Sequence, residues 1–418
     1  MKIVVLGGGS PSTPALFRCL AVQPRLPRLG FSLVGRSPEK LEAVLRAARL
    51  LADGLPITIE AAGFSSLELS AALGGADVIL VQVRFGGYEG RHFDESFPLD
   101  FGLCGDEGLG PGGLSAAWRS WPGMKEVLAT IAVTCPAALV LILSSPVGLM
   151  VGLARLHFPA LRTYGICELP WTTLLDLAAL LKAEASRIDY DYFGINHIGW
   201  FHRLALDDRD LLLEYTTQEF LRARWPSSAL VAACAGFPTR YLKIHYNPEE
   251  VLGEQLRRVS SRAEILRQIG RESHEVFREG GIEQILAALS LRPTPWYEHA
   301  LVPLFLSLAG VPTSTSFFLT GPNGPMESAF DSSDCLELPT LIDSGRLSAK
   351  NPLRQPPAQI LDTVNAFVTY ERKAMQAITR QDASQMTDAL TLHPWVRSAA
   401  LASALASKII SQYDTGLN

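Results

Sequence analysis

The sequence predicts an α/β fold built on a doubly wound parallel sheet, and three observations lead to that prediction. Short apolar runs of strand length alternate with stretches of helical periodicity through the first half of the chain. The first of these runs leads directly into a glycine-rich turn. Polar residues follow the later runs, as expected where the carboxyl ends of parallel strands form a ligand-binding edge. With 418 residues, 48% of them hydrophobic, the chain is long enough for two domains with sizeable cores.

The predicted sheet lies in the N-terminal half. Four apolar runs are predicted strands: residues 2–6, 31–34, 76–83 and 138–143. Residues 14–20 and 37–51 are predicted helices, the second with a proline near its first turn. Residues 164–167 and 192–194 are predicted strand ends that carry polar side chains into a site.

Helical patterns dominate after about residue 200. They cover residues 211–224, 262–277, 282–291, 358–379, 383–390 and 396–413. The sequence therefore predicts two domains, a sheet domain over residues 1–195 and a mostly helical domain over residues 196–418.

Charge and cysteine content exclude several classes of protein. The formal net charge is −5 and no run of Lys or Arg occurs, which argues against binding to nucleic acid or to an anionic membrane. The six cysteines show no paired spacing, which is typical of a reducing compartment such as the cytoplasm. Residues 131–154 carry no charge over a length that could span a bilayer, but Pro136 and the Ser144–Ser145–Pro146 break divide them. We therefore predict a soluble cytoplasmic enzyme, with a buried strand and a helix in this stretch.

The turn after the first predicted strand is a candidate phosphate-binding loop, formed by Gly7, Gly8, Gly9 and Ser10. Glycines let the backbone approach a dinucleotide pyrophosphate, and the helix that follows offers unpaired N–H groups. The turn does not match the full G-x-G-x-x-G pattern, so a plain tight turn is the alternative. The second predicted strand is followed by Arg36 rather than by an acid for the ribose hydroxyls. An arginine can bind a 2′-phosphate, so NADP is an alternative to NAD. The other interpretation is that Arg36 simply faces the solvent.

Residues 84–122 form a polar connection rich in glycine and proline. Its charged side chains include Arg84, Arg91, His92, Asp94, Glu95, Asp106, Glu107 and Arg119. A segment of this composition packs poorly, so we predict that these groups bind a ligand, with a solvated loop as the alternative. The segment follows the predicted strand 76–83, whose carboxyl end belongs to the binding edge of a doubly wound sheet.

A thiol and an imidazole stand at two further predicted strand ends. Cys167 lies in GICELP and His197 lies in GINHIG. Thiolate and neutral imidazole together suit a borderline divalent ion, and an incomplete ligand set would leave positions for substrate. The spacing matches no structural zinc motif, so a buried cysteine and a hydrogen-bonded histidine are the ordinary alternative.

These segments together resemble glycoside hydrolase family 4, in order along nearly the whole chain. RFGGYEGRHFDESFPLDFG resembles the family's R-x-G-G-x-x-x-R-x-x-D-E, and GDEGLGPGGLSAAWRSWP resembles its G-x-E-x-x-G-x-G-G … R-x-x-P. GICELP, FGINHIGWF and PTRYLKIHY are similar to the family's C-N-x-P, G-L-N-H and Y-L-R-Y-Y segments. Later matches are Arg262 with Glu264, Arg292 with Tyr297, VTYERKAMQAI and ALTLHPWV.

The resemblance implies a Rossmann-type sheet domain followed by a mostly helical α+β domain, as in lactate and malate dehydrogenases. It implies a glycosidase that needs NAD and Mn²⁺ or another divalent ion, and that acts on a β-glucoside or its 6-phosphate. In this family NAD⁺ takes hydride from C3 of the sugar, a base removes the C2 proton, and the glycosidic oxygen leaves from C1. Water then adds, and the NADH formed reduces C3 again. The resemblance also implies a homodimer or homotetramer.

Roles for individual residues follow from the same resemblance. Cys167 and His197 are the implied metal ligands. Tyr241 takes the position of the base, which requires a nearby positive charge because a phenol ordinarily has a pKa near 10; Tyr246 is the competing tyrosine. The implied substrate-binding residues are Arg84, Glu107, Asn196, Arg262 and Arg292.

Three departures from the family pattern bear on specificity. Glu168 stands where β-type members usually have Asn, and it is a candidate general acid for the leaving oxygen. Ser144–Ser145–Pro146 replaces an Asn-Pro that helps to position cofactor or sugar. Glu298 would repel a substrate phosphate if it faced the site. The alternatives to a glycosidase are a 2-hydroxy-acid dehydrogenase and a non-catalytic sugar or dinucleotide sensor.

Overall fold

The computed structural model describes residues 1–207, 209–217, 225–312, 316–343 and 345–414. Its centre is a sheet with the strand order β10-β8-β7-β12-β11-β6-β5-β4-β1-β2-β3, to which β13 adds beside β12 and β9 beside β8. The strands are β1 (Lys2–Leu6), β2 (Leu29–Val34), β3 (Ile57–Ala62), β4 (Val78–Val81), β5 (Leu139–Ile142), β6 (Arg162–Ile166), β7 (Asp189–Ile195), β8 (Ile198–Leu206), β9 (Arg209–Asp210), β10 (Phe237–Pro238), β11 (Phe317–Pro322), β12 (Cys335–Asp343) and β13 (Arg346–Ala349).

Helices surround this sheet. They are α1 (Thr13–Ala21), α2 (Pro38–Leu51), α3 (Ser66–Leu73), α4 (Gly87–Ser96), α5 (Gly110–Thr134), α6 (Val147–His157), α7 (Leu169–Leu181), α8 (Leu211–Thr217), α9 (Ser228–Cys234), α10 (Lys243–Tyr246), α11 (Pro248–Leu256), α12 (Arg262–Glu279), α13 (Ile282–Ser290), α14 (Val302–Leu308), α15 (Ala358–Arg380), α16 (Ala383–Leu392) and α17 (Ala399–Asp414). A π-helical turn, Trp296–Leu301, precedes α14.

The parallel half of the sheet confirms the predicted doubly wound fold. β3, β2, β1, β4, β5 and β6 are parallel neighbours in that order. The chain runs outward from β1 to β3 on one side and from β4 to β6 on the other, so the strand order reverses between β1 and β4. In open α/β sheets, ligands bind beside the carboxyl ends of the strands at such a reversal.

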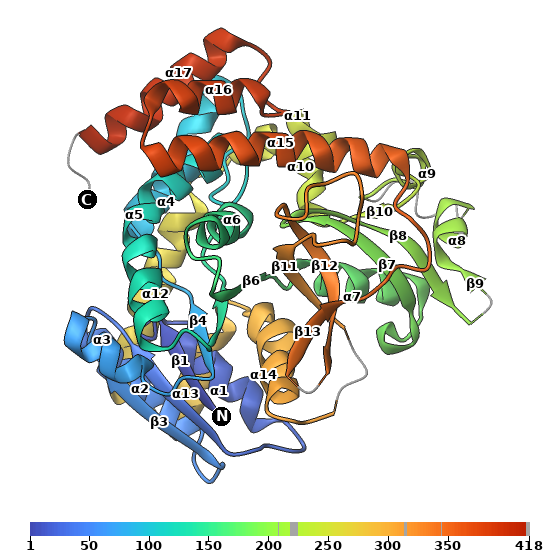
Figure 1. Ribbon diagram of the computed structural model, residues 1–418. Helices are drawn as coiled ribbons and strands as arrows, with labels where there is room; N and C mark the ends of the chain where they lie inside the picture. Colours follow the sequence, from blue (N-terminus) through green and yellow to red (C-terminus); the bar gives the residue numbers. More distant parts are fainter. Residues whose placement is uncertain (208, 218–224, 313–315, 344, 415–418) are drawn as a thin grey trace.

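An antiparallel half continues the same sheet. β11 pairs with β6, and β12, β7, β8 and β10 follow outward. In Figure 1 these strands lie to the right of β6, while the parallel strands lie at the lower left. One sheet thus runs from the first predicted domain into the second, and the division at residue 195 stays a prediction. The sequence pattern missed β3, β8, β11 and β12.

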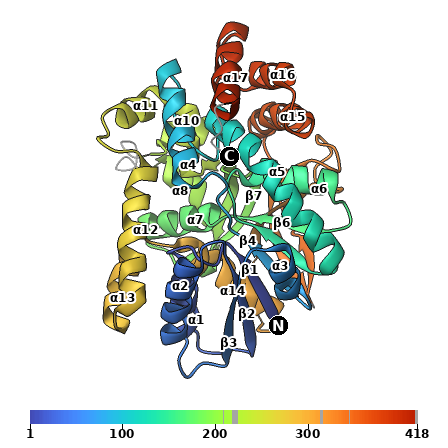
Figure 2. The ribbon, with the colours of Figure 1, turned by 90° about the vertical axis from the view of Figure 1, so that its left-hand side faces the viewer.

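Helices cover both faces of the parallel half. α1, α2, α13 and α14 pack on one face, in a core that includes Ile3, Phe31 and Phe305. α3, α5, α6 and α15 to α17 pack on the other, in a core that includes Val4 and Leu405. Figure 2 shows α12 and α13 standing beside α1 and α2. Because both faces are covered, the central strands are apolar throughout, as the sequence predicted.

The predicted helices after residue 200 are present with shifted ends, while residues 218–224 of the predicted helix 211–224 lie outside the described residues. The segment 84–122 is the main difference, because α4 and the first half of α5 occupy most of it. Its glycines let helices approach closely: a Cβ on Gly112 would lie 2.3 Å from the carbonyl oxygens of Asp94 and Asp106. Our prediction that this segment packs poorly was therefore wrong.

The uncharged stretch 131–154 contains the end of α5, then β5 and α6, which confirms the predicted strand and helix. Among the residues that the structure describes, none of the helices combines the length and the apolarity needed to cross a bilayer.

Candidate active site

A cavity of about 520 Å³ opens at the carboxyl ends of β1, β4, β5 and β6. The loops after all four strands contribute to its wall. Nine of the predicted site residues line it: Ser10, Arg84, Glu107, Cys167, Glu168, His197, Tyr241, Arg262 and Arg292. The other five do not line it: Gly7, Gly8, Gly9, Arg36 and Asn196. The strand reversal therefore brings together residues that are far apart in the sequence.

The glycine turn after β1 is shaped by close backbone packing. Gly7 has φ +88°, and a Cβ on it would lie 2.8 Å from the carbonyl oxygen of Gln82. A Cβ on Gly8 would lie 2.8 Å from the Cβ of Leu33. The N–H groups of both glycines donate to the carbonyl oxygen of Val34, at 3.0 and 2.8 Å. These glycines thus bring the turn close to β2 and β4, and their own N–H groups already have partners.

The end of the turn reaches the cavity. Ser10 lines it, and the carbonyl oxygen of Gly9 lies 3.0 Å from Nε2 of His274 on α12. Arg36, after β2, is exposed, whereas Lys40 on α2 lines the cavity. The turn, Ser10 and Lys40 fit a dinucleotide pyrophosphate, because they combine a backbone without room for side chains with a cation.

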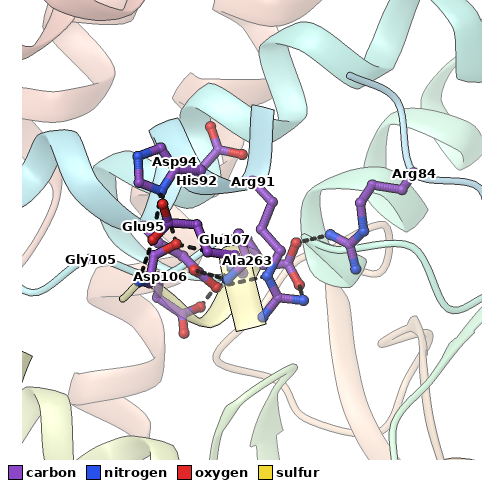
Figure 3. Close-up of polar contacts among 12 residues, drawn as sticks. Arg84, Arg91, His92, Asp94, Glu95, Gly105, Asp106, Glu107 and Ala263 are labelled. Atoms are coloured by element: carbon purple, nitrogen blue, oxygen red, sulfur yellow. Dashed lines mark hydrogen bonds and ion pairs between the residues drawn. The ribbon is translucent and has the colours of Figure 1, made fainter. Parts of the chain in front are cut away.

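A chain of partly buried ion pairs forms one wall of the cavity (Figure 3). Glu107 pairs with Arg84 and, at 2.7 Å, with Arg91. Arg91 also lies 2.7 Å from Glu95, which accepts the backbone N–H of Ala263 in the first turn of α12 at 2.9 Å. Burial opposes ionisation of Glu107, but the two guanidinium groups outweigh it and lower the pKa of this carboxyl to about 2. The network therefore keeps Glu107 ionised and ties α4 to the start of α12.

A second buried ion pair stands behind the cavity. Asp94 is fully buried and accepts two hydrogen bonds from Arg119, at 2.9 and 2.5 Å. Arg119 also donates to the carbonyl oxygen of Phe85 at 3.0 Å and to the hydroxyl of Tyr413 at 3.1 Å. The last helix of the chain, α17, is thus bonded to a residue of the cavity wall. Tyr413 was not among the predicted residues, because no local signal in the sequence relates it to Arg119.

Two further arginines face the cavity from the C-terminal half. Arg262 is the first residue of α12 and is exposed at the rim. The guanidinium of Arg292 lies 5.1 Å from the centre of the Trp296 ring, which holds it by a cation–π contact. Glu298 is exposed and does not line the cavity, so the expected repulsion of a substrate phosphate does not arise from it. Ser144 lines the cavity and donates to the carbonyl oxygen of Val83 at 2.7 Å.

Cys167 and His197 both line the cavity, at the end of β6 and in the turn between β7 and β8. His197 is buried with φ +70°, and its Nδ1 has no hydrogen-bond partner. Burial lowers the pKa of His197 to about 4, so its imidazole is neutral. Burial and the neighbouring Glu168 raise the pKa of the Cys167 thiol well above its ordinary value. Glu168 Oε2 lies 3.7 Å from the sulfur.

This pair fits a metal ion whose other ligands come from outside the chain. A neutral imidazole with an unpaired nitrogen is the form that binds metals. A thiol loses its proton when a metal binds it. Among the described residues, no group of three or more His, Cys, Asp or Glu side chains is placed to hold an ion. The remaining coordination positions would therefore be open to water or substrate oxygens.

Tyr241 packs directly on His197. The two rings are stacked, with centroids 4.2 Å apart and an angle of 5° between their planes. The carboxylate of Asp106, together with burial, raises the pKa of the Tyr241 phenol, and Cys167 and Glu168 add to the effect. The strongest influences on Tyr241 are therefore negative, and the positive charge that a tyrosine base needs is not among them.

Asn196 lies beneath the site, where a buried glutamate holds it. Its Nδ2 donates to Glu337 Oε1 at 3.2 Å, and the hydroxyl of Tyr192 donates to Glu337 Oε2 at 2.6 Å. Asn196 also bonds the thiol of Cys167. Burial raises the pKa of Glu337 to about 7. The sequence analysis missed Glu337, although an acid inside the apolar run CLELPTLI was a usable signal.

The similarity to known proteins shows the family of the chain. A model of the family 4 glycosyl hydrolases matches residues 2–183, and a model of the C-terminal domain of that family matches residues 192–396. A probable 6-phospho-β-glucosidase from Bacillus subtilis is 26% identical over 439 aligned residues, which cover 100% of this chain and 97% of the relative.

Two solved structures show the same fold. A 6-phospho-β-glucosidase from Thermotoga maritima, with manganese, NAD⁺ and glucose 6-phosphate, has a TM-score of 0.85 at 23% identity, covering 99% of this chain and 98% of that chain. An apo lactate dehydrogenase from Trichomonas vaginalis has a TM-score of 0.54 at 10% identity, covering 91% and 98% of the two chains.

The fold and the site define a Rossmann-type protein with a largely cationic cavity at the reversal point of its sheet. The chain belongs to the family 4 glycosyl hydrolases, whose two models together match most of its length. This membership confirms the resemblance found in the sequence and the glycosidase class, and it decides against the dehydrogenase alternative. The roles predicted for individual residues stay predictions.

Proposed function

We propose that this family 4 glycosyl hydrolase cleaves 6-phospho-β-glucosides with the help of a nicotinamide dinucleotide and Mn²⁺ or another divalent ion. The charge of the cavity carries the proposal, because six cations line it against two carboxylates: Lys40, Arg84, Arg91, Arg119, Arg262 and Arg292 against Glu107 and Glu168. Two of the cations, Arg91 and Arg119, are also paired with Glu95 and Asp94, and the other four still outnumber the two carboxylates. A sugar phosphate and a dinucleotide pyrophosphate together bring negative charges that such a cavity offsets. The similarity to 6-phospho-β-glucosidases supports the same substrate.

Cys167 and His197 are the residues that would hold the divalent ion, and residues 7–10 would receive the dinucleotide. When bound, the dinucleotide supplies a hydride acceptor and the ion supplies a Lewis acid for the sugar oxygens. His197 is ready to bind because burial keeps it neutral. Asn196 and Glu337 orient the site from below, since Asn196 joins the Cys167 thiol to the Glu337 carboxylate.

Proton transfer falls to Tyr241 and Glu168. The Tyr241 ring is fixed by its stacking on His197, which supports Tyr241 as the base that removes the C2 proton of the sugar. Because its neighbours are negative, Tyr241 can act as a base only when a cation lies next to it. Glu168, beside Cys167, donates a proton to the leaving glycosidic oxygen.

The sugar phosphate is held by arginines from three parts of the chain. Arg84 follows β4, Arg262 begins α12 and Arg292 precedes the π-helical turn. Glu107 pairs with Arg84 and fixes the direction of its guanidinium group. Arginine suits this role because its planar group bonds two phosphate oxygens at once.

The proposal extends to organisation and location. We propose two domains with a division near residue 195, a homodimer or homotetramer, and a reducing compartment such as the cytoplasm. The six cysteines are all free and buried, which suits a reducing compartment.

Hydrolysis of a 6-phospho-β-glucoside in D₂O, with NAD⁺ and Mn²⁺ present, tests the mechanism. We expect deuterium at C2 of the released sugar and no net NADH, because the hydride returns to C3. Tyr241→Phe should lower the rate at least about 100-fold, the usual contribution of a general base. Tyr246→Phe is the matched control, since the Tyr246 hydroxyl accepts a hydrogen bond from Cys234 away from the cavity. Hydrolysis without deuterium at C2 would contradict the proposal.

A further inference from the structure

Strand β2 ends in an arginine at the place where dinucleotide folds recognise the adenosine ribose. β2 ends at Val34, Gly35 and Arg36 follow, and Arg36 is exposed. In doubly wound sheets an acid near this position bonds the ribose 2′-hydroxyl of NAD, whereas an arginine accommodates the 2′-phosphate of NADP. The end of β2 therefore bears on which dinucleotide the chain accepts.

Gly35, the residue before Arg36, packs against the glycine turn. The N–H of Gly35 donates to the carbonyl oxygen of Ala62 at 3.2 Å, and a Cβ on Gly35 would lie 3.4 Å from the nitrogen of Gly9. Lys40 lies in the first turn of α2 and lines the cavity. Its Cβ would be 3.8 Å from a Cβ added to Gly9. Gly35 and Lys40 thus both pack against Gly9, so the segment that carries Arg36 and Lys40 borders the turn.

Two acids on the neighbouring β3 and α3 already accept hydrogen bonds. Glu60 on β3 accepts a hydrogen bond from the hydroxyl of Ser32. Glu68 on α3 accepts one from the hydroxyl of Ser65 at 2.5 Å. Glu39, exposed on α2, is the acid that directly precedes Lys40, and it is the rival ligand for a ribose hydroxyl.

We propose that this chain binds a 2′-phosphorylated dinucleotide, NADP, in preference to NAD, with Arg36 and Lys40 holding the 2′-phosphate. The inference rests on the proposed function, because it specifies the dinucleotide which that function requires. It sets this chain apart from the Thermotoga maritima structure, which contains NAD⁺. A phosphate between two cations accepts charge-assisted hydrogen bonds that are stronger than those of a ribose hydroxyl.

Titration of the purified chain with NADPH and NADH, followed by nucleotide fluorescence without sugar, measures this preference without any turnover. We expect NADPH to bind at least about tenfold more tightly, as charge-assisted bonds to one phosphate would give. Arg36→Asp should remove the difference. Arg25→Asp is the matched control, because Arg25 is an exposed arginine that precedes the start of β2, and the charge change is the same.

Two further measurements keep the result decisive. If Arg36→Asp does not fold, competition of 2′,5′-ADP and ADP against NADPH on the unaltered chain isolates the 2′-phosphate, and 2′,5′-ADP should compete more strongly. Glu39→Gln should leave the preference unchanged. Equal or tighter binding of NADH, or loss of NADH binding in Glu39→Gln alone, would overturn the inference and leave the proposed function standing. Failure to bind either dinucleotide would instead overturn the proposed function.

Discussion

Replacing Arg91 by alanine tests the ion-pair network beside the cavity. The Arg91 side chain is 12% exposed, and its guanidinium lies 2.7 Å from Glu95 and 2.7 Å from Glu107. Removing one partner of a buried ion pair costs about 3–5 kcal/mol, because the remaining charge stays buried without compensation. Glu107 keeps its pair with Arg84, which offsets part of the loss. We therefore expect Arg91→Ala to lower the free energy of unfolding by about 3 kcal/mol, the low end of that range.

The same substitution should weaken binding of a sugar phosphate. Glu95, which Arg91 fixes, accepts the backbone N–H of Ala263 at 2.9 Å. That bond anchors the start of α12, where Arg262 faces the cavity. When Glu95 loses Arg91, its carboxylate is no longer fixed in direction, so the first turn of α12 and Arg262 are held less firmly. We expect the dissociation constant for glucose 6-phosphate to rise, as measured by calorimetry with the unaltered chain as reference.

Urea unfolding, followed by tryptophan fluorescence, measures the stability change. Arg187→Ala is the control, because Arg187 pairs with Asp207 on the surface, where the two side chains are 56% and 70% exposed. Exposed pairs contribute about 0–1 kcal/mol, so this variant should unfold almost as the unaltered chain does. If Arg91→Ala were no less stable than Arg187→Ala, the argument from burial would be refuted.

Three further predictions concern the metal site and pH. Cys167→Ser should lower the affinity for Mn²⁺, measured by electron paramagnetic resonance. Cys19→Ser is the control and should leave the affinity unchanged, because Cys19 is buried and does not line the cavity. Equal affinities in the two variants would show that Cys167 is not a metal ligand. Glu337→Gln should lower the affinity for Mn²⁺ about tenfold, because residues that orient a metal site through hydrogen bonds typically contribute that much. An unchanged affinity would refute the positioning role of Glu337. Burial lowers the pKa of His202 to about 4, below its unfolded value near 6.5, so the unfolded chain takes up protons first as pH falls. Stability should decrease from pH 6.5 downward, by about 2 kcal/mol at pH 5 from this residue. His202→Asn should therefore reduce the pH dependence of the unfolding midpoint, and the other buried histidines, such as His197, should account for what remains.

The parallel half of the fold could be predicted because its signals are local. Buried parallel strands are apolar throughout, so the runs at β1, β4 and β5 are visible without a partner. Residues that follow such strands must meet at one edge of the sheet, which is why Arg84 and Cys167 were found.

The features that the sequence analysis missed depend on contacts between distant segments. Tyr413 bonds Arg119 across most of the chain, and Glu337 bonds Asn196 from a strand that pairs antiparallel with β7. The helix α5 was missed because its first residues, Gly110–Gly113 with Pro111, have low helix propensity. Close packing against Asp94 and Asp106 leaves no room for side chains there, so tertiary contacts decide the local structure.

The charges in the cavity are separated, and this separation bears on the substrate. The groups that act most strongly on Tyr241 include Asp106 and Glu168, which raise the pKa of its phenol. Burial lowers the pKa of Arg292, and the nearby guanidinium groups of Arg84 and Arg91 lower it further.

Glu107 acts on both Tyr241 and Arg292 and stays ionised between the two ends of the cavity. A divalent cation at the acidic end and a phosphate at the basic end would each relieve the repulsion there. A glycoside without a phosphate would leave the basic end uncompensated. The electrostatics of the whole cavity, more than any single residue, therefore favour a phosphorylated substrate.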